Sequence, residues 1–298
     1  MIQITENEMK RLHNKWLAKN LVLGIVLGAL MCWAICTSDF GIAMVLLTVT
    51  AILAFAVISH GGGLRLLDAL LQLRDDQLSD KTVDRLILLM GKSKNFAERI
   101  SVTLLLCDVY RYRGEIDRAL QLINTVDRER FFQYPSSGMN FYSCVMDIYD
   151  SVGDSESVLA AYRDGSAFID ECALRNINCC CIAARCFIDL QKAMGNYRAA
   201  LEMQLLLNRF SSENGFSRQV SELGTANIKN SSYSDFLAGL ELYRTAELAL
   251  LLGNTPRAAE YIDRAGPVIS RSSFYLEKAN ALSAKIRDTN SGGLKNER

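Results

Sequence analysis

The chain carries two uncharged stretches near its N-terminus, LVLGIVLGALMCWAICT (residues 21–37) and FGIAMVLLTVTAILAFAVIS (residues 40–59). A membrane-spanning helix needs about 20 mainly apolar residues, with a range of roughly 17 to 25. A cleaved signal peptide does not explain the second stretch. A buried hairpin of a soluble core would be expected to show a polar face. We therefore predict a transmembrane helical hairpin over residues 20–60.

Basic residues lie before the first stretch and after the second, at the two outer ends of this hairpin. They are Lys10, Arg11, Lys15, Lys19, Arg65 and Arg74. The connection between the two stretches holds Asp39 and no Lys or Arg, so the positive-inside rule predicts a multi-pass protein of the cell membrane with both termini cytoplasmic. Residues 1–19 would then be a cytoplasmic N-terminal segment. Gly24 and Gly28 form a G-x-x-x-G pattern, which permits close packing either with the second span or with another copy of the chain.

The rest of the chain is predicted to be helical. Its few prolines favour an all-α fold, because proline disrupts helix interiors. Residues 61–93 begin with three glycines, which predict a hinge, and continue with an amphipathic run. That run is either a helix along the membrane surface or the first core helix of a helical-repeat domain over 94–287. The polar residues 288–298 are typical of a disordered tail.

Four glycines introduce a recurring pattern in this domain. The segments are GEIDRAL (114–120), GDSESVL (153–159), GNYRAAL (195–201) and GNTPRAA (253–259). Each glycine can end a helix in the left-handed conformation, and the polar residue after it can cap the next helix. In the fourth segment Thr255 and Pro256 fit the N-cap and first helical position. A small apolar residue five positions after each glycine would let the two helices of a hairpin approach each other. These residues are Ala119, Val158, Ala200 and Ala258.

This pattern resembles the tetratricopeptide repeat, a helix–turn–helix unit of roughly 34 residues. Tyr110 and Tyr149, four residues before their glycines, match the tyrosine of that repeat. The early Trp and the closing Pro are absent, and the glycines are spaced more widely. The resemblance implies a stacked solenoid of helical hairpins. Within it, the polar stretch 211–235 would be an insertion or a degenerate helix, and 272–287 a terminal capping helix.

The resemblance also implies a concave groove lined by the first helix of each hairpin. The positions six before each glycine would face it, and all four are acidic: Asp108, Asp147, Asp189 and Glu247. Neighbouring groove positions would include Arg111, Asn140, Asp150, Arg185, Lys192 and Tyr243. A column of carboxylates favours a basic peptide or a protein with a Lys- or Arg-bearing surface. The alternative is that these side chains are simply solvated charges.

Composition argues against several other classes of protein. The 33 basic and 33 acidic side chains cancel, whereas a nucleic-acid-binding protein would show a basic excess. The cysteines downstream of the hairpin, including Cys172 and 179–181, are expected to pack as small apolar residues, with a metal or redox site as the alternative. Phosphate-loop, dinucleotide, zinc-protease and nucleophile-elbow motifs are missing. We therefore expect no enzyme, no catalytic residues, no metal and no cofactor.

These observations predict an all-α protein in which two transmembrane helices precede a stacked helix–turn–helix solenoid. The expected role is that of a membrane-anchored scaffold or adaptor that binds a protein or basic-peptide partner at the lipid bilayer. One alternative is an accessory or oligomerising subunit of a membrane complex, in which the hairpin would make the contacts of a homo-oligomer. The other is a peptide-binding sensor that relays through the hinge at 61–63.

Overall fold

The computed structural model describes residues 4–36, 42–45, 47–50, 78–93, 96–214 and 232–293. These residues are helical or form short connections, and no strand occurs among them. The predicted all-α class is therefore confirmed. The helices are α1 (Glu6–Cys36), α4 (Asp80–Lys92), α5 (Phe96–Tyr112), α6 (Ile116–Asn124), α7 (Arg128–Phe131), α8 (Pro135–Val152), α9 (Ser155–Cys172), α10 (Ile177–Ala193), α11 (Tyr197–Asn214), α13 (Ser232–Leu251), α14 (Thr255–Ile269) and α15 (Ser273–Gly293).

The four predicted glycine turns join four helix pairs, α5–α6, α8–α9, α10–α11 and α13–α14. The glycines adopt left-handed backbone angles, with φ of 77°, 78°, 77° and 74° at Gly114, Gly153, Gly195 and Gly253. At Gly153 the next amide, of Asp154, donates to the Tyr149 carbonyl at 3.1 Å, which is the closing bond of a Schellman turn. The sequence therefore identified each of these helix ends correctly.

Side-chain caps form at two of the four second helices. The Asp154 carboxylate accepts from the Ser157 amide at 3.0 Å, and the Asn254 side chain accepts from the Arg257 amide at 3.2 Å. In the fourth hairpin the N-cap is therefore Asn254, one residue before the predicted Thr255. An asparagine directly after a left-handed glycine can reach the third amide of the helix, which leaves Thr255 inside the first turn.

Close packing within the hairpins depends on small residues. Those five positions after the glycines are buried: Ala119, Val158, Ala200 and Ala258. In the second hairpin two glycines add to this effect, because a Cβ atom on Gly138 would lie 2.7 Å from the Phe168 ring, and one on Gly165 would overlap the Tyr142 ring. The aromatic rings of α8 and α9 thus pack into gaps where the opposite helix has no side chain.

The stacked pairs pack against each other, an arrangement compatible with a helical-repeat solenoid. The first and last parts of the array also meet. The Tyr112 ring of α5 lies 5.2 Å from Phe236 of α13 and 6.3 Å from Tyr275 of α15, measured between centroids. Helix α15 therefore does more than cap one end of the array: it contacts the first hairpin as well.

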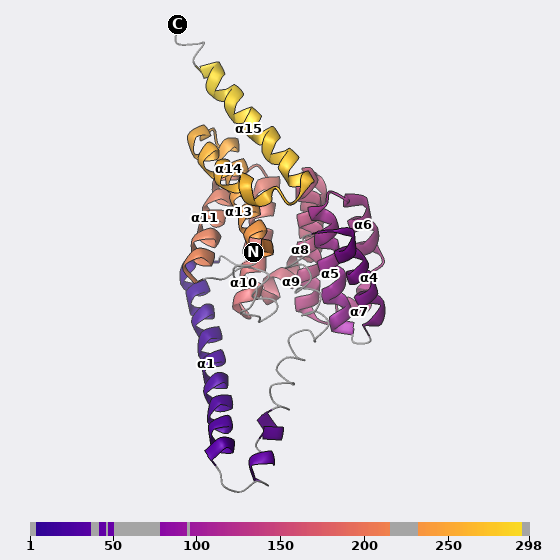
Figure 1. Cartoon of the computed structure of the whole chain (residues 1–298). Helices are drawn as coiled ribbons and strands as arrows, with labels where there is room; N and C mark the ends of the chain where they lie inside the picture. Colours follow the sequence, from indigo (N-terminus) through magenta and orange to yellow (C-terminus); the bar gives the residue numbers. More distant parts are fainter. Residues whose placement is uncertain are drawn as a thin grey trace.

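Helix α1 has two different halves (Figure 1). Its first turns pack on α10 and α11, where Met9, Leu12 and His13 are buried. The His13 ring meets Phe210 edge-on at 5.7 Å. Beyond Leu21 the helix projects away from the rest of the protein (Figure 1), and most of its large apolar side chains are exposed.

Among the described residues α1 is the one helix long and apolar enough to cross a membrane. The prediction of a membrane-spanning segment is thus supported for one helix. Most of the predicted second span and the glycine hinge at 61–63 lie outside the described residues. The described parts of that span, 42–45 and 47–50, are helical. The predicted boundary at residue 19 falls inside α1, because the predicted N-terminal segment and the predicted first span belong to one uninterrupted helix from Glu6 to Cys36.

Two further predicted boundaries differ from the structure. Helix α15 continues past Arg287 to Gly293, so the predicted disordered tail begins with helical residues. The Thr289 hydroxyl donates to the Lys285 carbonyl at 2.8 Å, which satisfies a polar side chain within the helix. The predicted polar insertion at 211–235 contributes its first residues to α11 and its last to α13.

Candidate functional site

The structure brings the predicted groove residues together in the interior of the array. Helices α5, α8, α10 and α13 supply Asp108, Asp147, Asp189 and Glu247. Their exposure differs: Asp147 and Asp189 are 0% and 1% exposed, whereas the side chains of Asp108 and Glu247 keep 19% and 24%. The expectation of an open, solvated column therefore does not hold for the two central residues.

Cations of the same chain neutralise most of these carboxylates. Arg244 binds Asp147 at 2.7 Å, and Arg111 binds Asp108 at 2.8 Å. Lys192 bridges Asp150 at 3.0 Å and Glu247 at 2.6 Å. We call the whole set the interior charge cluster. Its members are Asp108, Arg111, Asp147, Asp150, Arg185, Asp189, Lys192, Glu241, Arg244, Glu247 and Lys278.

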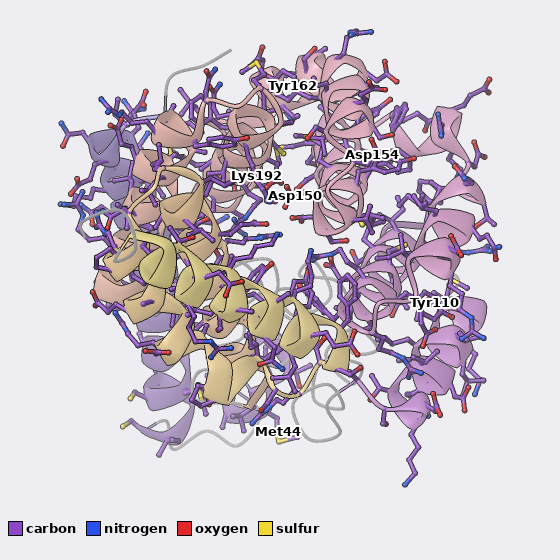
Figure 2. All side chains as sticks on the ribbon, turned by 90° about the horizontal axis from the view of Figure 1, so that it is seen from above. Met44, Tyr110, Asp150, Asp154, Tyr162 and Lys192 are labelled. Carbon is purple, nitrogen blue, oxygen red and sulfur yellow. The ribbon has the colours of Figure 1, made fainter. Side chains whose placement is uncertain are left out.

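The pKa shifts follow from this geometry. Burial opposes the charged form of Lys192, yet Asp150 and Glu247 hold its pKa above the ordinary lysine value. Burial also opposes ionisation of Asp150, but Lys192 and Arg244 lower the pKa of that carboxyl. Figure 2 shows Lys192 and Asp150 beside each other in the view from above. The pair is therefore ionised around neutral pH.

A second group of contacts surrounds Arg185, which is 1% exposed. Its guanidinium forms an ion pair with Glu241 and donates to the Gln204 side-chain oxygen at 2.9 Å. Gln204 in turn donates to Glu241 at 2.7 Å, so the three side chains form a closed triangle between α10, α11 and α13. Of the other predicted groove residues, Tyr243 is buried and Asn140 is half-buried.

Asp189 differs from the other carboxylates of the cluster. One of its oxygens is buried without a hydrogen-bond partner among the described residues. Burial, together with Asp150 and Asp147, raises the pKa of Asp189 to about 7. Within the described residues the cluster has six acids and five cations, so one acid remains uncompensated. The cluster can therefore take up a proton, or a positive charge from outside, at this position.

Helix α15 covers the cluster. The Tyr275 hydroxyl accepts from Arg111 at 3.2 Å, and the Ser272 hydroxyl donates to the Tyr112 carbonyl. The Lys278 ammonium donates to the Ser151 carbonyl and lies near Glu247 and Asp150; burial is the main cause of its lowered pKa. Contacts from α15 to α5 and α8 explain why residues predicted to line an open groove are enclosed.

Several cluster members were not predicted. Glu241 and Arg244 lie six and three residues before the predicted Glu247 on α13, and this spacing places all three on one helix face, so the sequence contained a signal for Glu241 and Arg244. Lys278 and Tyr275 had no such signal, because their part in the cluster depends on where α15 crosses the array. Whether the predicted groove residues bind a partner stays a prediction, which none of these contacts tests.

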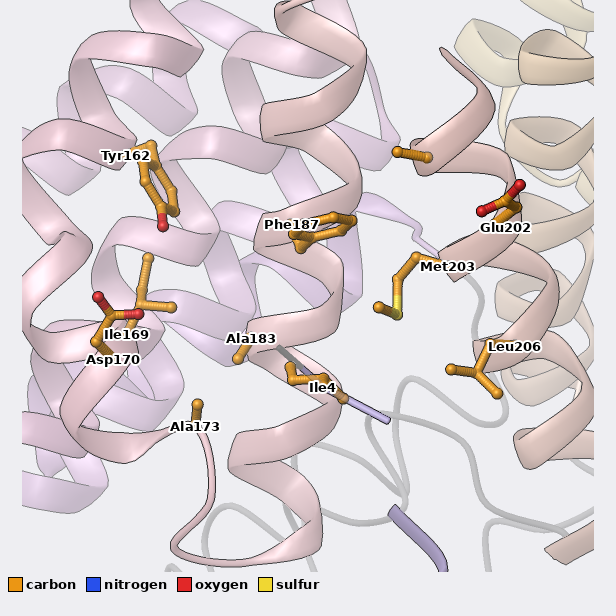
Figure 3. Close-up of a pocket in the computed structure, with 11 residues that line it drawn as sticks. Ile4, Tyr162, Ile169, Asp170, Ala173, Ala183, Phe187, Glu202, Met203 and Leu206 are labelled. Carbon is orange, nitrogen blue, oxygen red and sulfur yellow. The ribbon is translucent and has the colours of Figure 1, made fainter. Parts of the chain in front are cut away.

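A separate pocket of about 390 Å³ lies on the other side of α10 (Figure 3). Its walls come mainly from α9, α10 and α11, with Ile4 at one end. Tyr162, Phe187 and Met203 make the lining largely apolar, and Glu202 lies at its exposed edge. The volume is within the usual range for small-molecule sites.

The cysteines of the helical domain are buried, as predicted for side chains that pack as small apolar residues. Burial raises the pKa of Cys179 to about 11 and that of Cys180 to about 12. Their thiols are therefore protonated at neutral pH, which disfavours nucleophilic or metal-binding chemistry at these two positions. Cys32 and Cys36 lie exposed on the projecting half of α1.

Comparison of the chain with protein-family models, with curated proteins and with solved structures finds no match. Among its described residues, the chain is an all-α array of stacked helix pairs with one apolar helix that projects from it.

Proposed function

We propose that this protein is a membrane-anchored scaffold or adaptor whose helical-repeat domain recruits a protein partner to the bilayer. The observation that carries this proposal is the division of α1. Its first half is part of the packed domain, while its second half presents exposed side chains such as Leu21, Ile25 and Trp33. A projecting helix of this kind is stable when lipid replaces water around it.

The repeat domain is proposed to be a tetratricopeptide-like solenoid. Four left-handed glycine turns, each followed by a buried small residue, support this proposal. Stacked helical hairpins of this type commonly present extended surfaces to protein partners. We further propose that the chain spans the membrane twice and that both termini are cytoplasmic, on the basis of the flanking basic residues.

The proposed partner carries Lys or Arg side chains. The most accessible carboxylates of the interior charge cluster are Asp108, Glu241 and Glu247, whose side chains are 19%, 32% and 24% exposed. The cluster also has one more acid than it has cations among the described residues. A basic partner segment would therefore meet Asp108, Glu241 and Glu247 first, and electrostatic attraction would favour its approach.

A second candidate is an accessory or oligomerising subunit of a membrane complex. It is favoured by the G-x-x-x-G face of α1, where a Cβ atom on Gly24 or Gly28 would meet no described atom within 4 Å. Such a face lets another transmembrane helix approach closely. In this case the membrane segment, rather than the repeat domain, would make the main interface.

A crosslinking pull-down from the cell's own membranes tests the proposal. The full chain is compared with a soluble version in which residues 20–77 are replaced by a flexible linker, so that the docking half of α1 stays in place. Capture of the same partner by both chains supports the scaffold. Capture by the full chain alone supports the accessory subunit. Asp108→Asn with Glu247→Gln should weaken capture and reduce its salt dependence, and unchanged capture would contradict the proposed groove.

A further inference from the structure

The hairpin topology gives the repeat domain two unlike edges. The glycine turns at Gly153 and Gly195 lie at one edge, because each ends a first helix. The connections between hairpins, 125–134 and 173–176, lie at the opposite edge, where first helices begin. We call this second one the connection edge. Figure 1 shows α7 at the end of the domain from which α1 projects.

Helix α1 holds this edge in a fixed relation to its apolar half. The helix is continuous from Glu6 to Cys36. Three contacts fix its first half: the buried Met9, the ring contact of His13 with Phe210, and the ion pair between Glu6 and Arg209 at 2.7 Å. Because the helix is unbroken, the orientation of its projecting half fixes the orientation of the repeat domain. The connection edge therefore faces the medium that surrounds the projecting half.

We propose that the connection edge is a lipid-contact surface that rests on anionic headgroups of the bilayer. The inference depends on the proposed membrane anchoring and adds to it the face and the headgroup chemistry. Helix α7 carries Arg128 and Arg130, both exposed, beside Glu129 and the N-cap Asp127, whose carboxylate accepts from the Arg130 amide at 3.2 Å. Tyr134 directly follows and is 58% exposed. Cations beside an amphipathic aromatic ring suit the interface between headgroups and water.

The two arginines are held in place by aromatic rings. The Arg130 guanidinium lies 4.3 Å from the centre of the Phe96 ring, and that of Arg128 lies 5.5 Å from the Phe141 ring. The same edge continues on α1, where Lys15 and Lys19 are exposed just before the apolar half. The basic side chains therefore occur on two elements that reach the same level of the molecule (Figure 1).

A photocrosslinking experiment on the full chain in vesicles tests the surface. Benzoylphenylalanine replaces Tyr134 at the connection edge or Met194 beside a glycine turn at the opposite edge. Met194 is a matched control, since it is also apolar and 46% exposed. The vesicles contain alkyne-tagged phosphatidylglycerol in phosphatidylcholine, and flotation first establishes that the chain is inserted.

Several-fold more lipid adduct at position 134 than at position 194 is the expected result. Equal adducts in chains that float would overturn the lipid-contact surface while leaving the membrane anchor intact. A chain that fails to float would instead contradict the proposed anchoring itself. A protein adduct at position 134, formed in preference to lipid, would assign the edge to a protein partner and overturn the proposal.

The charge requirement is tested separately. Arg128→Gln with Arg130→Gln should lower the lipid adduct at position 134 by about threefold or more, because each basic residue near an anionic surface contributes on the order of a fivefold preference. The exposed Arg198, next to a glycine turn, provides the control: Arg198→Gln should leave the adduct unchanged. Alkyne-tagged phosphatidylcholine serves as the neutral probe, in vesicles of phosphatidylcholine alone. Equal adducts with this probe and with tagged phosphatidylglycerol in anionic vesicles would exclude headgroup charge as the attraction.

Discussion

Replacement of Arg244 by methionine should be among the most destabilising single changes in the repeat domain. Arg244 binds Asp147 at 2.7 Å, and the Asp147 side chain is wholly buried. Arg244 also lies near Asp189 and lowers the pKa of that carboxyl, against the larger effect of burial. Methionine keeps much of the arginine stem but removes the charge, so Asp147 becomes a buried carboxylate that has lost its ion pair with Arg244.

The expected cost is about 3–5 kcal/mol, the range for breaking a buried pair by removing one partner. For a domain of this size that corresponds to a fall in Tm of roughly 6–20 °C. The assay is urea unfolding of the full chain in detergent, followed by helical circular dichroism. The control is Arg118→Met, since Arg118 is 63% exposed and its pair with Glu115 should be worth no more than about 1 kcal/mol.

The double variant Arg244→Met, Asp147→Asn separates charge from packing. Asparagine removes the buried charge that the single variant leaves behind. At least about half of the lost stability should therefore return, because an ion pair replaced as a unit costs far less than a broken one. A single-variant cost below about 1 kcal/mol, or a double variant no more stable than the single one, would refute the reasoning.

Three further predictions follow from local geometry. Asp189→Asn should raise the free energy of unfolding at pH 8 by roughly 2–4 kcal/mol, and this gain should shrink as the pH is lowered from about 7 to about 4 in urea titrations. In this window the folded state, in which the pKa of Asp189 is about 7, keeps a proton on the carboxyl that the unfolded state has released. The stability of the wild-type chain therefore falls as the pH rises through the window. Gly153→Ala should cost about 1 kcal/mol because φ is 78°, whereas Gly91→Ala inside α4 should gain about 0.5–1 kcal/mol; equal unfolding midpoints for the two would contradict the assigned turn. Met9→Ala should cost about 2–4 kcal/mol and increase amide exchange in the first half of α1, while Lys10→Ala, at a side chain that is 50% exposed and pairs with Glu6 at 2.7 Å, should cost no more than about 1 kcal/mol.

The sequence was most informative where structure is determined by neighbouring residues. A left-handed glycine followed by a capping residue closes a turn through contacts a few positions apart, and the turns at Gly114, Gly153, Gly195 and Gly253 were all predicted. The small residues after them were predicted for the same reason. By contrast, the interior position of Asp147 and Asp189 could not be predicted, because it depends on the curvature of the stack and on the path of α15.

One face of α8 in the interior charge cluster shows the difference between what neighbouring residues determine and what distant residues determine. The spacing of Asp147 and Asp150 along α8 predicts that both lie on one charged helix face. For an isolated helix, such a face is expected to be exposed to solvent. Burial of that face requires cations from α10 and α13 in the right positions, and Lys192 and Arg244 provide them. The same residues that suggested an open binding surface therefore also stabilise the stack, and a partner must compete with, or add to, pairs that already exist.

The surface against which the first half of α1 packs is likewise determined by residues that are distant in the sequence. Met9, Leu12, His13 and Trp16 lie on one helix face at spacings that the sequence shows plainly. Such a stripe beside a membrane span is equally compatible with a helix on the lipid surface and with one packed on protein. The hydrophobic surface of α10 and α11, with Phe210 against His13, determines that the stripe packs on protein. Because α1 then continues unbroken, the domain is joined to its proposed anchor by a helix rather than by a flexible linker. Any force or reorientation of the membrane segment would therefore reach the repeat domain through the Met9 contact, which is why Met9→Ala should loosen the whole junction and not only one side chain.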